Sequence, residues 1–221
     1  MDNCAESKEY ENIFSMEELQ TLINWADNQP VSNFQGLDAA RTIDVNKSLH
    51  YDVPGSPPNK IIRPKLNQIV GSNHRFVGGS YKELRTPYSP HIDNDAYMVY
   101  MSKTSDSNIS ADINSEFAIL IPLVEDERFK TVVFDIDDKE IFIAMGDPML
   151  EHWLGEENDL NMDDFEHVPE PTRSQIKRLP VDYTATWKLG NIIVWRRSQL
   201  HSSTNYAKFG LIKKFIIVFA A

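Results

Sequence analysis

The sequence is poor in cysteine, in long apolar runs and in positive charge. A single cysteine, Cys4, occurs among 221 residues, so the chain cannot form an intrachain disulfide or a thiolate cage for zinc or an iron–sulfur cluster. No stretch approaches the roughly 20 consecutive apolar residues of a membrane-spanning helix. Residues 1–6 lack the basic and apolar regions of a secretory signal peptide. These absences predict a cytoplasmic protein that does not enter a membrane.

Basic residues are outnumbered by acidic ones, 22 against 33, which gives a formal net charge of −11. A protein that binds nucleic acid through its phosphates needs positive charge, so this balance argues against a nucleic-acid partner. The hydrophobic content of 41% and the charged content of 25% are those of an ordinary globular protein. We predict one domain over residues 1–221, with a helical and loop portion over residues 1–74 and a β-rich core over residues 75–221.

Two helices are expected in the first third of the chain, and none beyond it. Ser15 and Glu18 have the spacing of a capping box, and apolar residues recur at helical spacing over Leu19–Ala26. A second, shorter helix is predicted over Lys60–Val70 from a weaker apolar stripe. The intervening residues 31–64 are rich in turn-forming residue types and are expected to be loop.

Short runs of apolar and β-branched residues follow, separated by turn signals. Many short strands without alternating helices are typical of an all-β sandwich or barrel. The predicted strands are Phe76–Leu84, Tyr97–Met101, Glu116–Leu123, Thr131–Asp135, Glu140–Ala144, Asn191–Trp195 and Phe215–Phe219. Residues 151–180 interrupt them with a long insertion that is acidic in its first half. We interpret its charge as a solvated acidic surface; the alternative is a lid that favours a cationic substrate.

His91 and Asp93 stand two residues apart, the spacing at which side chains of an extended segment point to the same face. A third side chain, His201, follows an apolar strand and is expected in a polar turn at a sheet rim. Two histidines and one carboxylate on one face of an octahedral metal leave three positions open, and this set is typical of non-haem Fe(II) oxygenases. These three residues are therefore the candidate metal ligands and catalytic residues.

Several stretches together resemble the Fe(II)/2-oxoglutarate-dependent dioxygenase superfamily, in particular its prolyl-hydroxylase-like and phytanoyl-CoA-hydroxylase-like branches. They are Tyr88–Asn94, Ala118–Leu123, Thr131–Asp135 and Gly190–Ser203, and the resemblance covers roughly residues 81–219. It implies a double-stranded β-helix, or jelly roll, with Fe(II) held at its open end by His91, Asp93 and His201. It also implies that 2-oxoglutarate and O2 are cosubstrates, and that a C–H bond of a small molecule or a peptidyl residue is hydroxylated.

The family resemblance further implies a basic residue on the last core strand, paired with the distal carboxylate of 2-oxoglutarate. Lys213 and Lys214 precede Phe215–Phe219, and only one of them can point inward because side chains alternate along a strand. Alignment with the family's Arg-x-Ser pattern favours Lys214, with Lys213 as the second choice, although an isoleucine then stands at the serine position. Tyr81 and Tyr88 are candidates to contact the same carboxylate or to line the pocket; either one could equally be a core or rim aromatic.

Two other functions remain open on the sequence. A cupin-like jelly roll could use the same ligands for non-oxidative metal chemistry, such as an isomerisation, and would be indifferent to 2-oxoglutarate and O2. A non-catalytic jelly-roll binding protein would not bind Fe(II) tightly. The adjacent Lys213 and Lys214 favour the oxygenase, because two lysines beside an apolar strand attract an anionic partner; the alternative is that they mark a solvated strand end.

Overall fold

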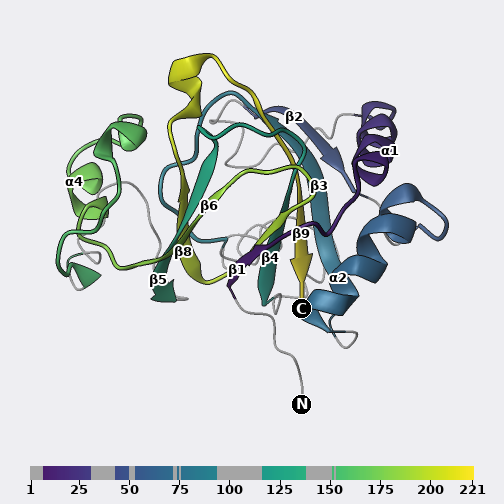
Figure 1. Ribbon diagram of the computed structural model, residues 1–221, viewed down its shortest axis with the longest axis horizontal. Coiled ribbons are helices and arrows are strands. Elements are labelled where there is room, and N and C mark those ends of the chain that lie inside the picture. The colour runs from purple at the N-terminus through teal and green to yellow at the C-terminus, as the bar shows by residue number, and fades with distance from the viewer. Residues whose placement is uncertain are drawn as a thin grey trace, which may run out of the picture.

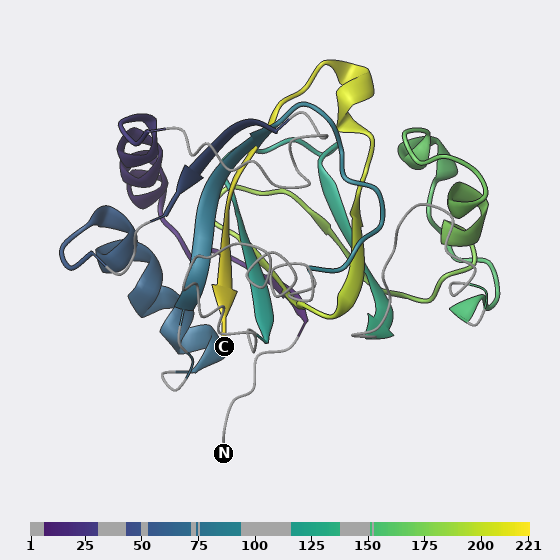
Figure 2. The same ribbon diagram turned by 180° about the vertical axis from the view of Figure 1, so that it is seen from behind.

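The computed structural model describes residues 7–30, 43–49, 53–71, 74, 76–93, 116–137, 151 and 153–221. Within these residues the strands form two antiparallel sheets, with helices on the two outer sides of the pair (Figures 1 and 2). The prediction of a mainly β protein is confirmed. No helix in this described part of the chain is long and apolar enough to cross a membrane.

The larger sheet has the strand order β1-β7-β4-β9-β3-β2. Its strands are β1 (Lys8–Tyr10), β2 (Ile43–Ser48), β3 (Phe76–Leu84), β4 (Phe117–Pro122), β7 (Ile192–Arg196) and β9 (Lys213–Ala220). The smaller sheet has the order β6-β5-β8, formed by β5 (Lys130–Asp137), β6 (Val181–Thr186) and β8 (Gln199–Ser203). Because β9 pairs with both β3 and β4, the last strand of the chain lies inside the larger sheet.

Five predicted strands are confirmed as β3, β4, β5, β7 and β9. The predicted strands Tyr97–Met101 and Glu140–Ala144 lie outside the described residues. The expectation of loop over residues 31–64 is wrong at β2, which is an edge strand paired with β3. Its sequence alternates apolar and polar residues over too few positions to indicate a strand. The expectation that His201 lies in a turn is also wrong, because it is the central residue of β8. This strand was missed because its sequence is mostly polar.

Helices α1 (Met16–Asp27) and α2 (Arg63–Val70) cover one face of the larger sheet (Figures 1 and 2). The predicted capping box begins α1: the Glu18 amide donates to Ser15 Oγ at 3.2 Å, and the Ser15 amide donates to the Glu18 carboxylate at 2.8 Å. A π-helical turn, η2 (Pro58–Ile62), leads directly into α2, so the predicted second helix is confirmed and begins two residues early.

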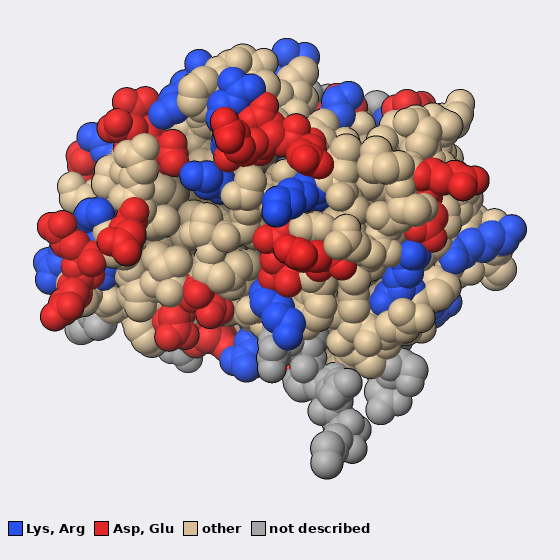
Figure 3. Space-filling model, in the orientation of Figure 1, with Lys and Arg blue, Asp and Glu red and all other residues tan. Residues whose placement is uncertain are grey.

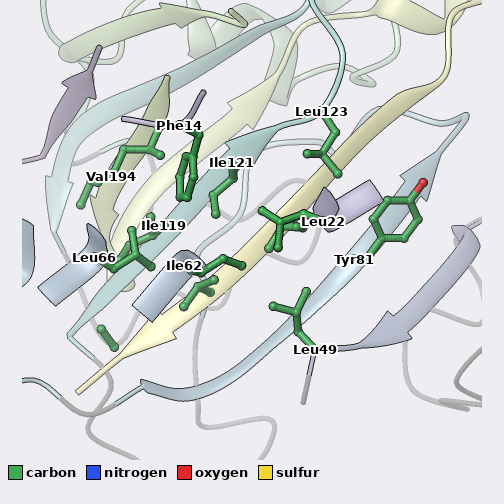
Figure 4. Packing of buried hydrophobic residues seen from close by; sticks show 14 of the residues in the cluster. Phe14, Leu22, Leu49, Ile62, Leu66, Tyr81, Ile119, Ile121, Leu123 and Val194 are labelled. Atoms are coloured by element: carbon green, nitrogen blue, oxygen red, sulfur yellow. The ribbon is translucent and has the colours of Figure 1, made fainter. Parts of the chain in front are cut away.

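The apolar core between these helices and the sheet is called here the helix-side layer (Figure 4). Each strand contributes every second residue to it, as the alternation of side chains along a strand requires. Its members include Leu22, Leu66, Tyr81, Ile119, Ile121, Val194, Ile216 and Val218, all of them buried. Burial of one such aliphatic side chain contributes about 1.5–3 kcal/mol, so this layer supplies much of the free energy that holds the helices to the sheet.

A turn at Gly190 ties the N-terminal segment to β7. Its carbonyl oxygen accepts hydrogen bonds from the amides of Ile13 and Phe14, at 2.7 and 3.0 Å. Gly190 has a φ of +87°, and a Cβ at this position would lie 2.7 Å from the carbonyl oxygen of Phe14. Only glycine fits such a close approach, and the result is a fixed starting point for the strand that leads to β8.

A second apolar core, the inter-sheet layer, lies between the two sheets. Phe215 and Ile217 of β9 face the smaller sheet, whereas Ile216 and Val218 between them face the helices. Other members of the inter-sheet layer are Leu84, Ala118, Leu120, Val133, Ala185, Trp187, Ile193, Trp195 and Tyr206. The parity of β9 is therefore fixed: its odd-numbered residues point between the sheets.

The insertion at residues 151–180 packs against the outer face of the smaller sheet. It contains η4 (Met162–Phe165) and α4 (Thr172–Ile176), so the expectation that helices are confined to the first third is wrong. Its buried apolar side chains form a third core with those of β5 and β8; they are Phe165, Val168, Ile176 and Leu179. Its acidic residues Glu156, Glu157, Asp159, Asp163 and Glu166 are exposed, as the interpretation of a solvated surface predicts.

Candidate metal centre

His91 and His201 are held side by side by backbone pairing. The amide of each residue donates to the carbonyl oxygen of the other at 2.9 Å, so the segment around His91 runs antiparallel to β8. Two residues on, the Asp93 amide donates to the Arg197 carbonyl in the turn between β7 and β8, at 3.0 Å. These hydrogen bonds bring two distant parts of the sequence together and direct all three predicted side chains to one place.

The candidate ligand atoms of His91, Asp93 and His201 lie within 4.8 Å of one another. The two imidazole centroids are 4.2 Å apart, and the carboxylate Oδ2 of Asp93 lies 3.6 Å from Nε2 of His201. Among the described residues, this is the one group of three histidine, cysteine or acidic side chains arranged to hold a metal ion. The convergence that the sequence spacing predicts is therefore present in the structure.

Both imidazole rings are oriented by backbone carbonyls. Nδ1 of His91 lies 2.8 Å from the Ser89 oxygen, and Nδ1 of His201 lies 3.1 Å from the Gln199 oxygen. A carbonyl oxygen can only accept a hydrogen bond, so each Nδ1 carries the proton. The tautomer leaves Nε2 with a free lone pair, which is the form in which histidine binds a metal ion.

The Asp93 carboxylate is fixed by Trp195, whose indole Nε1 donates to Oδ2 at 3.2 Å. Burial by itself raises the pKa of Asp93, but the basic groups around it outweigh burial and the pKa is lowered overall. These groups are the imidazoles of His201 and His91 and the side chains of Arg197 and Lys82. The carboxyl group is thus kept ionised, the state in which it can bind a cation.

The triad opens into a cavity of about 140 Å³ between the two sheets. Its walls are apolar over much of their area, through Leu84, Leu120, Trp195, Phe215, Ile217 and Phe219. Polar side chains line the rest: Lys82, Tyr88, Thr131, Ser202, Ser203 and Lys213. An apolar cavity with a few convergent polar groups is the usual form of a small-molecule site.

Lys213 is the deeply buried cation of this cavity, with only 3% of its surface exposed. Its Nζ lies 3.1 Å from Ser203 Oγ and 4.0 Å above the centroid of the Trp187 ring. No carboxylate of the described residues forms an ion pair with it. Burial lowers the pKa of its ammonium group to about 7. A buried cation without a counterion is costly, and an anion in the cavity would remove that cost.

Two of the predicted cosubstrate residues lie on the wrong face. Lys214 points away from the cavity and pairs with Glu83 at 3.3 Å, and the Tyr81 hydroxyl donates to the same carboxylate at 2.6 Å. Both belong to the helix side of the sheet, so the preference for Lys214 and the candidacy of Tyr81 are corrected. Both faces of Phe215–Phe219 are apolar, and the lysine that points inward was therefore not readable from the strand.

Tyr88 lines the cavity, which is one of the places that the sequence left open for it. Its ring centroid is 5.1 Å from that of His91. Its backbone carbonyl accepts hydrogen bonds from the Ser203 amide and from Ser202 Oγ, both at 3.3 Å. The segment that carries His91 is thus hydrogen-bonded to β8 through the Ser203 backbone and the Ser202 side chain.

Trp195 and Lys82 were not predicted as site residues. Trp195 lies near the end of an apolar strand, and β8 begins four residues later. A buried indole N–H at such a position needs a hydrogen-bond partner, which is a sign of a polar group nearby. The signal for Lys82 was a lysine at an inward-facing position of Phe76–Leu84, where the same face carries Leu84. Neither signal identifies a function until the fold places both residues in the cavity that contains Asp93.

The donor set suits Fe(II). Two imidazole nitrogens and one carboxylate oxygen, each held in its ligating form by hydrogen bonds, are the facial set that leaves open positions on an octahedral ion. A site of several thiolates is absent from the described residues, and the chain has only one cysteine. His91, Asp93 and His201 would therefore hold the metal, and the cavity would hold whatever occupies the open positions.

Comparison with solved structures shows that the fold is known. The alpha-ketoglutarate-dependent non-haem epimerase SnoN of nogalamycin biosynthesis matches with a TM-score of 0.57 and 11% identity, over 96% of this chain and 76% of that chain. The alpha-ketoglutarate-dependent non-haem carbocyclase SnoK matches with a TM-score of 0.57 and 10% identity, over 97% of this chain and 79% of that chain. SnoN in complex with Fe3+, alpha-ketoglutarate and nogalamycin RO matches with a TM-score of 0.53 and 12% identity, over 96% of this chain and 77% of that chain.

These likenesses confirm the predicted double-stranded β-helix, the jelly roll of 2-oxoglutarate oxygenases. No model of a protein family matches the sequence, and no curated protein sequence matches it either.

Proposed function

We propose that the protein is an Fe(II)- and 2-oxoglutarate-dependent oxygenase that hydroxylates a C–H bond of a small molecule or a peptidyl residue. One observation carries the proposal: the cavity that contains the two-histidine, one-carboxylate triad also contains a buried lysine without a counterion. A metal site alone would suit many reactions. The lysine adds a place for an anionic group in the same cavity.

In this proposal His91, Asp93 and His201 hold Fe(II) in the ligating forms described above. The hydrogen bonds from Nδ1 to backbone carbonyls keep the two rings from turning, and the Trp195 indole keeps the carboxylate in place. Such fixed ligands are worth about 10–100-fold in metal affinity in other proteins. In this proposal the surrounding protein orients the two imidazole rings and the carboxylate toward the metal.

Lys213 is the residue that binds the distal carboxylate of 2-oxoglutarate in this proposal. Its ammonium is already held by Ser203 Oγ and lies against the Trp187 ring, so little freedom is lost when an anion binds. Thr131, whose hydroxyl accepts a hydrogen bond from Trp187 Nε1 at 3.0 Å, lies in the same part of the wall. Lys213 therefore replaces Lys214 as the proposed cosubstrate residue.

Bound iron would supply the reaction of O2 with 2-oxoglutarate, which yields succinate and CO2 and provides the oxidising power for a C–H bond. The cavity walls exclude water from this reaction, because Leu120, Phe215 and Ile217 present only hydrocarbon to it. Support for oxidative chemistry comes from the shared fold with alpha-ketoglutarate-dependent enzymes. Since SnoN is an epimerase and SnoK a carbocyclase, hydroxylation is the proposal's own choice among the outcomes.

The test is an anaerobic titration of metal-free protein with Fe(II) and 2-oxoglutarate, followed through the weak visible charge-transfer band of the iron chelate. We expect one equivalent of each to bind and the band to form. His201→Ala should abolish the band while the circular dichroism spectrum stays unchanged. His74→Ala is the matched control, since His74 is partly buried and lies outside the cavity. Admission of air to the wild-type complex should release succinate.

The outcomes separate the three readings of the sequence. Fe(II) binding without the band, and without an effect of 2-oxoglutarate, would replace the proposal by non-oxidative metal chemistry. Absence of Fe(II) binding would leave a jelly roll that binds something other than a metal. A band that persists in His201→Ala would show that the ligand assignment is wrong.

A further inference from the structure

Lys82 is a second lysine in the cavity wall, and the proposed reaction gives it no role. It lies on β3 at an inward-facing position, half-buried, with Phe215 of β9 as its cross-strand neighbour. Its sequence neighbour Glu83 faces the helices and pairs with Lys214. In the part of the chain that the structure describes, Lys82 has no ion-pair partner of its own.

Lys82 and Lys213 occupy different places in the cavity. Lys213 is opposite Leu84 on β3, two residues along the same face, and its ammonium reaches across to Ser203 of the smaller sheet. Lys82 is opposite Phe215 instead, and both lysines line the cavity. The two cations therefore enter the cavity from different strands of the larger sheet, Lys213 from β9 and Lys82 from β3.

The charges of the loaded site balance without Lys82. The two charges of Fe(II) are offset by Asp93 and by the carboxylate of 2-oxoglutarate that binds the metal, and Lys213 is offset by the second carboxylate. The remaining cation near the triad, Arg197, donates from Nε to the Asp93 carbonyl at 3.1 Å and stacks on the Phe219 ring at 4.4 Å. Among the described residues that line the cavity, Lys82 is then the lysine whose charge no anion of the loaded site offsets, and an uncompensated charge in a mostly apolar cavity is costly.

We propose that Lys82 binds the carboxylate of the substrate that is oxidised, and that this substrate is a monocarboxylic acid with an apolar body. The inference rests on the proposed function and adds the substrate class to it. The carboxylate would lie at Lys82 and the hydrocarbon chain against Phe215, Ile217 and Phe219. The C–H bond to be oxidised is then placed near the metal by two contacts, one ionic and one apolar.

The chemistry of the wall favours this class over others. A phosphate monoester carries about −1.5 to −2 charges at neutral pH, more than one unpaired lysine offsets. An amino group on the substrate would lack an acceptor, since Asp93 is the only acidic side chain among the described residues of the wall. Surface lysines are in a different situation: in Figure 3 blue lysine and arginine groups are interspersed with red acidic ones. The acidic insertion packs on the outer face of the smaller sheet, so the proposed selectivity is assigned to the residues of the cavity wall.

The experiment compares acids with their amides. A panel of straight-chain and phenyl-substituted monocarboxylic acids, each paired with its primary amide, is titrated into the anaerobic complex of full-length protein with Fe(II) and saturating 2-oxoglutarate. Binding is followed by the change in the charge-transfer band and by the intrinsic tryptophan fluorescence, so turnover is not required. Because a charge-assisted hydrogen bond is worth about 1.5–3 kcal/mol, the best acid should bind at least about tenfold more tightly than its amide.

Lys82→Met should lower the affinity of the acid to that of the amide and leave the affinity for 2-oxoglutarate unchanged. Lys82→Arg should retain the preference for acids, and Lys214→Met, on the opposite face, is the matched control. Equal affinity for acids and amides, or no binding by the panel, would overturn the inference. So would an equal loss of 2-oxoglutarate affinity in Lys82→Met, which would assign Lys82 to the cosubstrate. Failure of the band to form in the wild type is a failure of the proposed function instead.

Discussion

Lys47 and Lys213 are both buried, on opposite faces of the larger sheet, and they differ in what surrounds the ammonium group. Lys47 lies on the helix side. Its Nζ donates to the carbonyl oxygens of Ala26 and Asp27 at 2.8 and 3.3 Å, at the end of α1. These carbonyls lie at the negative end of the helix dipole, and the Ala26 carbonyl also accepts a hydrogen bond from the Gln29 amide at 3.0 Å. The buried charge of Lys47 is therefore compensated by the fold itself.

Lys213 has a single hydroxyl, Ser203 Oγ, and the faces of Trp187 and Tyr206 around it. Burial lowers its pKa to about 7, which shows that the fold stabilises the charged form poorly. Burial alone therefore does not distinguish a structural lysine from a lysine that binds a ligand. The distinction lies in whether the protein supplies the acceptors, and at Lys213 an anion from outside must supply them.

The largest expected effect comes from removing the charge of Lys213. Lys213→Met should weaken 2-oxoglutarate binding by about 100-fold, because a charge-assisted contact of up to about 3 kcal/mol is lost. The same change should leave the unliganded protein as stable as before or more stable, since a poorly compensated buried charge is replaced by an apolar side chain of similar length. Calorimetric titration and urea denaturation measure the two quantities. Unchanged affinity for 2-oxoglutarate would remove Lys213 from the proposed site.

The opposite result is expected on the helix side. Lys47→Met should destabilise the protein by about 1–3 kcal/mol, because the carbonyls at the end of α1 lose a charged donor. The affinity of the folded protein for Fe(II) and 2-oxoglutarate should not change, since Lys47 lies outside the cavity. Urea denaturation followed by tryptophan fluorescence measures the stability. A fall in 2-oxoglutarate affinity in this variant would break the distinction between the two lysines.

Much of the fold could be predicted because several strands are buried on both faces. Residues Phe117–Pro122 are almost continuously apolar, and such a run is recognisable without knowledge of its partners. Strand β8 was not predicted for the opposite reason, because most of its residues are polar. His201, Ser202 and Ser203 line the cavity of the metal site, and the Gln199 side chain donates to the Phe134 carbonyl of β5 and to Asp182 of β6. A strand whose side chains serve chemistry loses the apolar pattern by which strands are found.

The candidate site was predictable as far as local spacing determines it. The separation of His91 and Asp93 implies a common face in an extended segment, and the structure shows their convergence. The choice between Lys213 and Lys214 was not local, because it depends on which face of β9 meets the smaller sheet. Trp195 and Lys82 depend in the same way on contacts between strands that are distant in sequence.

A smaller effect, the pH dependence of 2-oxoglutarate affinity, also separates Lys213 from Lys47. Free Lys213 has a pKa of about 7, but beside the carboxylate of 2-oxoglutarate its ammonium form is stabilised and its pKa rises. Above pH 7 the lysine must therefore take up a proton when 2-oxoglutarate binds, and the affinity should fall by up to about tenfold per pH unit. Below pH 7 the affinity should be nearly constant. Calorimetry in two buffers of different ionisation enthalpy measures the proton uptake directly.

The stability of the unliganded protein should change with pH in the opposite direction. The folded-state pKa of Lys213 lies below the ordinary value of 10.5, so between about pH 7 and 10.5 the unfolded chain binds more protons and stability rises with pH. Lys213→Arg separates this lysine from other titrating groups, because a guanidinium group stays protonated throughout that range. Both pH dependences should disappear in Lys213→Arg and persist in Lys47→Met. If 2-oxoglutarate affinity were constant from pH 7 to about pH 9 in the wild type, Lys213 would already be compensated within the fold, as Lys47 is.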